Sequence, residues 1–158
     1  MITGVRSALI CERVEQNDAG SANYFGICGA SLIAESNPGF LEIWAALHVE
    51  VDRKATQGHV KVEAADYSQI FPFDLPAGWW LAGMAFPLIV PVLRAGPLTV
   101  AVFDDGRKGK PFRFRWNIEI SPDAKILDEA AGRDFVETGR KAGEILAGDL
   151  AANGKVKH

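Results

Sequence analysis

Apolar and polar residues alternate along much of the first 120 positions of the chain. The alternation is strict in residues 112–120, and it recurs in residues 43–51 and 98–102. Strict alternation over this length is typical of a β-strand that buries one face and exposes the other to water. Many such strands in one chain cover a core by packing one sheet against another. The pattern therefore predicts an all-β domain.

The alternating runs are separated by turn-forming residues. No helical period occurs before Ser121, and a parallel sheet would require crossover helices between its strands. We therefore predict a two-sheet antiparallel, immunoglobulin-like sandwich of 7–8 strands, followed by one C-terminal α-helix. The predicted strands are residues 6–16, 23–35, 40–52, 59–65, 67–75, 86–93, 98–104 and 112–120.

Two features predict how particular strands pair. A register that places Glu50 opposite Lys61 puts the apolar residues of the third and fourth strands on one face and an ion pair on the other. Pro87 and Pro91 lie four residues apart, so both missing amide donors fall on the same lateral side of their strand. This arrangement favours an edge strand that is protected from further pairing.

The period of the pattern changes at Ser121. Ser121, Pro122 and Asp123 supply a hydroxyl N-cap, a first-turn proline and an early acid, which together favour a helix start. An apolar stripe at helical spacing then extends to about residue 151. The predicted organisation is a sandwich over residues 1–120, a helix over residues 121–152 and a frayed tail over residues 153–158.

Several glycines lower the helix propensity of this segment, so its apolar stripe needs a surface to pack against. The flank of the sandwich is one candidate, and the same helix of a second subunit is the other. Because the two sheets of a sandwich already face each other, we expect self-association through the helix. The expected interface residues are Leu127, Phe135, Gly139, Ala142 and Leu146.

Charge and composition narrow the expected partners. The net charge is −3 over 158 residues, with both signs scattered, which gives no general attraction for nucleic acid or anionic lipid. The start of the chain lacks a secretory pattern, and prolines and glycines interrupt the uncharged residues 75–93, which disfavours a membrane helix. We expect a cytoplasmic protein with no nucleic-acid partner, no membrane partner and no cofactor.

The two cysteines are the first candidates for chemistry. The hairpin that the pattern predicts would place Cys11 directly opposite Cys28, so the two thiols could oxidise or supply half of a metal site. Two small, buried, reduced side chains are the simpler interpretation, because free cysteine is among the most buried residue types.

Two histidines form the second candidate. His48 and His59 should share the outer face of neighbouring strands, near Glu63, and two imidazoles with a carboxylate suit zinc binding or acid–base work. Their spacing matches no zinc motif, so solvated surface histidines are the simpler interpretation.

Aromatic residues form the third candidate. Trp79 and Trp80, with Phe71 and Phe73 nearby, are suited to stacking on a sugar or gripping a partner protein. Plugging one end of the sandwich is the simpler interpretation, because large aromatic side chains are highly buried on average. Exposure of the tryptophans on a concave surface would favour the binding role.

The order of strands and turns resembles a known family. Residues 8–12 (Ala-Leu-Ile-Cys-Glu) open the chain, residues 26–29 (Gly-Ile-Cys-Gly) close a first hairpin, and residues 95–106 end in Asp-Gly. This layout resembles a family of uncharacterised bacterial β-sandwich proteins with a Leu-Cys-Asp-like first strand and an Asp-Gly hairpin near the end of the sandwich. The likeness covers about residues 6–119. It implies the sandwich fold, and it implies no catalytic residues because the family has no assigned activity.

The sequence contains no GxSxG, GxGxxG or GxxxxGK[ST] motif. We therefore predict a non-enzymatic interaction or scaffold module that binds a protein partner or a second copy of itself. Two alternatives stay open. One is a binder of small ligands or carbohydrates that uses the aromatic residues, and the other is a metal-dependent enzyme. The residues concerned are Trp79, Trp80, Phe71 and Phe73 for the first, and His48, His59 and Glu63 for the second.

Overall fold

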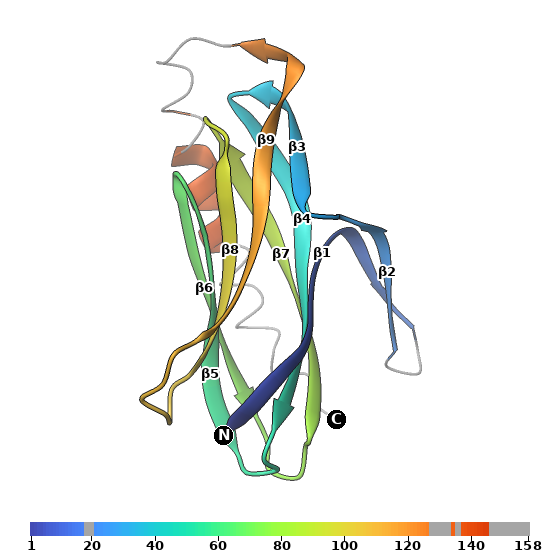
Figure 1. The fold of residues 1–158 in the computed structure, drawn as a ribbon, viewed down its shortest axis with the longest axis vertical. Coiled ribbons are helices and arrows are strands. Elements are labelled where there is room, and N and C mark those ends of the chain that lie inside the picture. Colours follow the sequence, from blue (N-terminus) through green and yellow to red (C-terminus); the bar gives the residue numbers. More distant parts are fainter. Residues whose placement is uncertain (18–20, 127–133, 135–136, 146–158) are drawn as a thin grey trace.

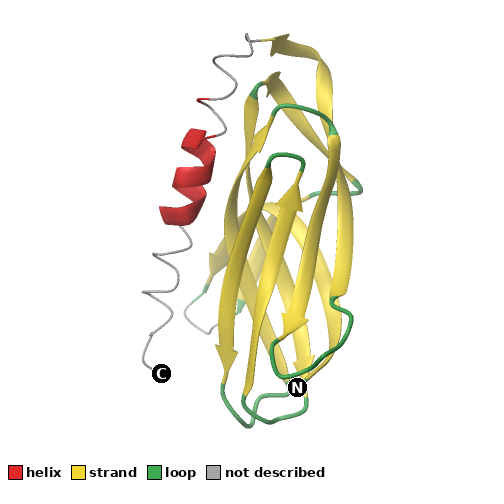
Figure 2. Cartoon of the chain, turned by 90° about the vertical axis from the view of Figure 1, so that its left-hand side faces the viewer, coloured by secondary structure: helices red, strands yellow, loops and turns green. Residues whose placement is uncertain are grey.

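Two curved β-sheets face each other, and a short helix runs alongside them (Figures 1 and 2). The computed structural model describes residues 1–17, 21–126, 134 and 137–145. Nine strands lie within these residues, and residues 137–145 form the C-terminal helix. No helix in the described part of the chain combines the length and the apolar content that crossing a membrane requires.

The first sheet has four strands in the order β2, β1, β4, β7. Its members are β1 (Ile2–Gln16), β2 (Ala22–Ile27), β4 (Gly39–Val51) and β7 (Leu81–Val92), and neighbouring strands are antiparallel. Because β7 ends the sheet, the edge position that its two prolines predict is confirmed.

The second sheet has five strands in the order β3, β9, β8, β5, β6. Its members are β3 (Ser31–Asn37), β5 (Thr56–Ala64), β6 (Tyr67–Leu75), β8 (Gly96–Asp104) and β9 (Phe112–Ile126). β3 pairs with β9 in parallel, whereas the other neighbours are antiparallel.

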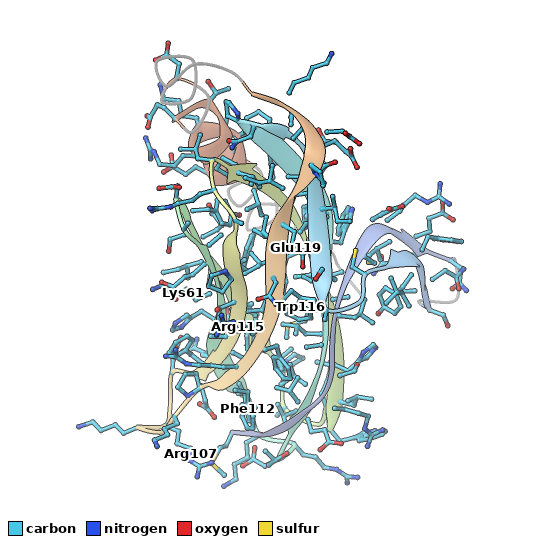
Figure 3. The ribbon with its side chains drawn as sticks, turned by 45° about the horizontal axis from the view of Figure 1, so that its top comes forward. Lys61, Arg107, Phe112, Arg115, Trp116 and Glu119 are labelled. Carbon is cyan, nitrogen blue, oxygen red and sulfur yellow. The ribbon has the colours of Figure 1, made fainter. Side chains whose placement is uncertain are left out.

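Alternate residues of the strands build the core between the sheets. On β9, Trp116 is only 9% exposed, while its neighbour Arg115 is exposed on the outer face (Figure 3). Burial of apolar surface stabilises such a core by roughly 25 cal/mol per Å². Side chains that are fully buried include Leu47, Val49, Val60, Val62, Val100 and Val102.

The predicted class is confirmed at the level of a mostly β domain with two sheets and one short C-terminal helix. The predicted strand number is wrong, because the single strand expected over residues 23–35 is two strands, β2 and β3. Gly29 and Ala30 bend the chain between them, and β3 joins the other sheet. The expectation of purely antiparallel pairing is also wrong, because β3 and β9 are parallel.

The predicted pairing of Glu50 with Lys61 is wrong, because β4 and β5 belong to different sheets. Glu50 instead pairs with Arg6 on the neighbouring strand β1, at 2.7 Å. Lys61 pairs with Glu63 on its own strand, at 2.6 Å. The alternation located the outer faces of both strands, but it did not identify their neighbours.

The helix start predicted at Ser121 is wrong, and so is the strand end predicted at Ile120. The Ser121 hydroxyl does accept a hydrogen bond from the amide of Asp123 (3.4 Å), as an N-cap would. β9 nevertheless continues to Ile126, because Lys125 and Ile126 lie in register with Ser36 and Asn37 of β3. Pairing with a distant strand therefore overrides the local helix signal.

The C-terminal helix packs against the edges of both sheets. A Cβ on Gly139 would lie 2.6 Å from Cε1 of Phe40 and 3.4 Å from Cβ of Pro91, both in the first sheet. Gly143 lies beside Tyr67 of β6, in the second sheet. The helix thus has a partner surface in its own domain, and self-association stays a prediction. Of the expected interface residues, Leu127, Phe135 and Leu146 lie outside the described residues.

Candidate functional site

A hairpin arm leaves the sandwich on the side opposite the helix (Figure 1). β1 pairs with β4 from Ile2 as far as Cys11, which lies opposite Trp44. Beyond Cys11, β1 pairs with β2 alone among the described residues. We call residues 12–16 and 22–27 the arm. The arm, β3 and residues 41–44 of β4 form the open side of the sandwich.

The open side exposes large apolar side chains. Ile27 on the arm is 62% exposed, and Ile33 on β3 is 57% exposed. Phe25 on the arm is 39% exposed, and the Arg13 guanidinium lies 4.4 Å from the centre of its ring. Single exposed apolar residues are ordinary, but a group of them on one side of a domain is typical of a binding surface.

A groove of about 360 Å³ lies at the root of the arm. It is formed where β1 turns away from β4, so one wall comes from the arm and the other from β3 and β4. The lining is mostly apolar, and its charged members are two glutamates. The lining residues are Glu12, Gly26, Ile27, Cys28, Ser31, Leu32, Ile33, Leu41, Glu42 and Ile43.

Gly26 shapes this root. Its φ of 61° lies in the left-handed region, which glycine adopts without a steric penalty. A Cβ there would also lie 2.5 Å from a carboxylate oxygen of Glu12. Any other residue at this position would push Glu12 away from the groove.

The predicted alignment of Cys11 with Cys28 is wrong by one residue, because Cys11 lies opposite Ile27. Both cysteines are free, and the amide of Cys28 donates to the carbonyl oxygen of Ile10 at 2.8 Å. Burial raises the pKa of both thiols, Cys28 raises that of Cys11 further, and Glu12 raises that of Cys28. Both groups therefore stay protonated near neutral pH, which makes them poor nucleophiles.

The structure does not bring the two histidines together, because His48 is on β4 and His59 is on β5 of the other sheet. His48 Nδ1 shares a hydrogen bond with Ser7 Oγ at 2.8 Å. His59 Nδ1 lies 2.7 Å from Asp105 Oδ1, and its ring stacks on Phe103. The described residues hold no group of three or more His, Cys, Asp or Glu side chains suited to a metal ion.

The aromatic cluster is divided between surface and core. Trp79 and Trp80 lie in the turn between β6 and β7 and are 39% and 52% exposed. Arg6 lies over the Trp80 ring, 5.5 Å from its centre. Phe71 is buried, and Phe73 is half-buried and packs against the core.

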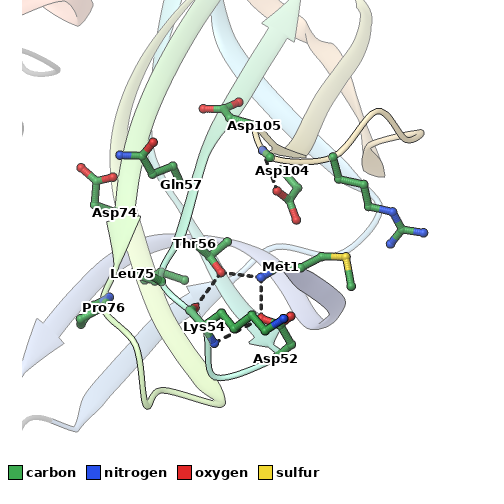
Figure 4. A pocket seen from close by; sticks show the side chains of 13 residues that line it. Met1, Asp52, Lys54, Thr56, Gln57, Asp74, Leu75, Pro76, Asp104 and Asp105 are labelled. Atoms are coloured by element: carbon green, nitrogen blue, oxygen red, sulfur yellow. Dashed lines mark hydrogen bonds and ion pairs between the residues drawn. The ribbon is translucent and has the colours of Figure 1, made fainter.

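A second groove, of about 900 Å³, lies at the end of the sandwich near Met1 (Figure 4). Three of its four carboxylates, those of Asp52, Asp104 and Asp105, are engaged within the chain. Asp104 accepts hydrogen bonds from the amides of Ile2 (2.7 Å) and Gly106 (3.0 Å). Asp52 accepts one from the α-amino group of Met1 at 2.6 Å, and this bond lowers the pKa of Asp52. These bonds fasten β1 and the hairpin turns to each other.

A scan against protein-family models finds no match, and no curated protein matches the chain. The candidate site is the open side. The sequence pattern does not reveal it, because that pattern predicts one strand over residues 23–35. The available signal was Gly29 with Ala30, which interrupts the alternation between Ile27 and Ile33.

Proposed function

We propose that the protein is a non-enzymatic interaction module that binds a partner protein at its open side, in the cytoplasm. The observation that carries the proposal is the pair of exposed isoleucines, Ile27 and Ile33, which line the same groove. Partner binding removes such side chains from water, which contributes to affinity in proportion to the apolar area covered.

The architecture supports this role. Strands fastened in two sheets hold the groove walls in place, so binding requires little ordering of the chain. The finer fold assignment, an immunoglobulin-like sandwich, belongs to the same proposal, because sandwiches of that kind carry binding surfaces on a constant core.

Site-specific photocrosslinking tests the proposal. Ile27 or Ile33 is replaced by p-benzoylphenylalanine in the full chain, which is expressed in cells of its source and irradiated. Ile70 on β6 is the matched control, because it is 51% exposed but lies away from the open side. We expect discrete higher-mass adducts from positions 27 and 33 and none from position 70. Equal labelling at all three positions, or none at any, would refute the proposal.

A carbohydrate-binding role is the second candidate, and the exposure of Trp79 and Trp80 favours it. The test is a titration of intrinsic fluorescence with a panel of neutral oligosaccharides. Binding should be saturable and should disappear in Trp79→Ala. A flat titration across the panel, with the fold intact by circular dichroism, would remove this candidate.

A further inference from the structure

We propose that the partner binds by adding a β-strand alongside residues 41–43 of β4, and that this strand carries basic side chains between apolar ones. This inference rests on the proposed function, because it specifies how the open side binds. The added strand would take the place beside β4 from which β1 turns away at Cys11.

The backbone of β4 provides the first argument. On one side, Leu41, Glu42 and Ile43 are in register with Val90, Ile89 and Leu88 of β7. On the other side, pairing with β1 ends at Trp44, and no described strand continues it. Alternate residues of a strand direct their N–H and C=O groups to each side, so this edge offers main-chain hydrogen bonds to an incoming strand.

The walls of the groove provide the second argument. Ile27 faces it from the arm, Ile33 from β3, and Leu41 and Ile43 from β4. An added strand sends alternate side chains to opposite faces. One set would therefore meet these apolar walls, while the other set would lie toward solvent and the rim.

Charge identifies the partner. Glu12 and Glu42 are the charged residues of the groove, both are exposed, and no described cation lies within ion-pair distance of either. A strand with lysine or arginine would supply the missing charges. A second copy of this chain is disfavoured, because a two-fold pairing at β4 would bring Glu42 near its own copy, and like charges directly opposite each other destabilise a strand pair.

The test uses the full chain and a display library of random nonapeptides as the probe. We expect enriched peptides to alternate apolar and basic residues. Their affinity, measured by fluorescence anisotropy, should fall about tenfold or more in Glu42→Lys, since truncating or reversing a charge at an interface weakens binding. The matched control is Asp74→Lys, which makes the same change of charge at an exposed position of β6, and its affinity should stay within about twofold.

Methylation of the peptide amides tests the strand geometry without altering the protein. N-methyl groups at one set of alternate peptide residues should abolish binding, whereas the other set should be tolerated, because only one set faces β4. Loss at every position, or at none, would overturn strand addition.

Three other outcomes of these experiments would also decide against part or all of the proposal. Photocrosslinks from positions 27 and 33 without any enriched peptide would leave the interaction module standing and refute the strand. Enriched peptides without basic residues would refute the charge argument. If the full chain sediments as a dimer that Glu42→Lys dissociates, the occupant is a second copy and the proposal is wrong.

Discussion

The two lateral sides of the sandwich differ in how far their sheet edges are covered. On the closed side, formed by β6, β7 and the C-terminal helix, the sheet edges are covered: Gly139 rests on Phe40 and Pro91, and Gly143 rests on Tyr67. On the open side, the arm swings away and leaves a groove with exposed isoleucines. Sheet edges invite pairing, so most proteins block them. Here one side is blocked by proline and helix, and the other is left accessible.

The comparison indicates that the closed side stabilises the fold and that the open side binds the proposed partner. Substitutions that disturb packing on the closed side should therefore lower the free energy of unfolding, whereas substitutions of exposed residues on the open side should leave it nearly unchanged.

Truncation after Ile126 removes the helix and should have the largest effect. It uncovers Tyr67, Pro91 and Phe40, so we expect a loss of about 3 kcal/mol, because burying a large apolar side chain contributes roughly 1.5–3 kcal/mol. The midpoint of thermal unfolding should fall by about 6–12 °C.

The same truncation decides how the helix is used. Light scattering should show the same number of chains per particle before and after truncation if the helix serves only its own domain. A full chain that is dimeric, and a truncated chain that is folded and monomeric, would instead support self-association through the helix.

Gly139→Val should have the next largest effect. The added side chain meets Phe40, since even a Cβ would approach its ring to 2.6 Å. Overpacking of this kind costs about 1–3 kcal/mol, measurable by urea unfolding. Thr138→Val is the control, because Thr138 is exposed on the same helix and should change stability by less than about 0.5 kcal/mol. Equal losses in both variants would mean that the contact with Phe40 is not responsible, because valine has a higher helix propensity than glycine and propensity alone would favour Gly139→Val.

Cys11→Ser tests the junction between the sandwich and the arm. Cys11 is fully buried, so the variant buries a hydroxyl and should lose about 1–2 kcal/mol. Cys28→Ser is the matched control, since Cys28 is only partly buried and should lose less. If Cys28→Ser lowered the stability more than Cys11→Ser, Cys28 would be the residue that stabilises the root of the arm.

Tyr67→Phe should slightly stabilise the closed side. The Tyr67 hydroxyl is buried without a hydrogen-bond partner among the described residues, and burial raises its pKa. Its removal relieves an unsatisfied polar group, so we expect a gain of up to about 1 kcal/mol. A loss of stability in urea unfolding would indicate that the hydroxyl has a partner.

Ile33→Ser should have the smallest effect on folding. The side chain is 57% exposed, so the free energy of unfolding should change by less than about 0.5 kcal/mol. The same variant should abolish binding of any peptide selected on the open side. A large loss of stability would instead assign Ile33 to the core and contradict the comparison.

Local patterns were sufficient to predict strands and their faces. The boundaries of β6 agree with the predicted strand over residues 67–75, and the alternation in β9 correctly places Trp116 inward and Arg115 outward. These features depend on residues that are close in the sequence, so the pattern contains them.

Sheet membership and register could not be predicted in the same way, because they depend on distant partners. Nothing near Glu50 indicates that its strand lies beside β1 and not β5. Likewise, pairing with β3 extends β9 past the N-cap signal at Ser121. Near Gly26, whose φ is left-handed, the strand register places Cys11 one residue away from its predicted position opposite Cys28. The open side depends on these pairings between strands that are distant in the sequence, so no local pattern predicts the candidate site.

The parallel pair of β3 and β9 has a consequence for the order of folding. β3 is synthesised early, but its sheet neighbour β9 is the last strand of the described residues, with Ser31 opposite Asn117. Contacts between residues so far apart form slowly, because a long loop must close before they are made. While the ribosome is still making β9, β3 has no strand to pair with in its sheet, and aggregation at this stage should compete with completion of the second sheet.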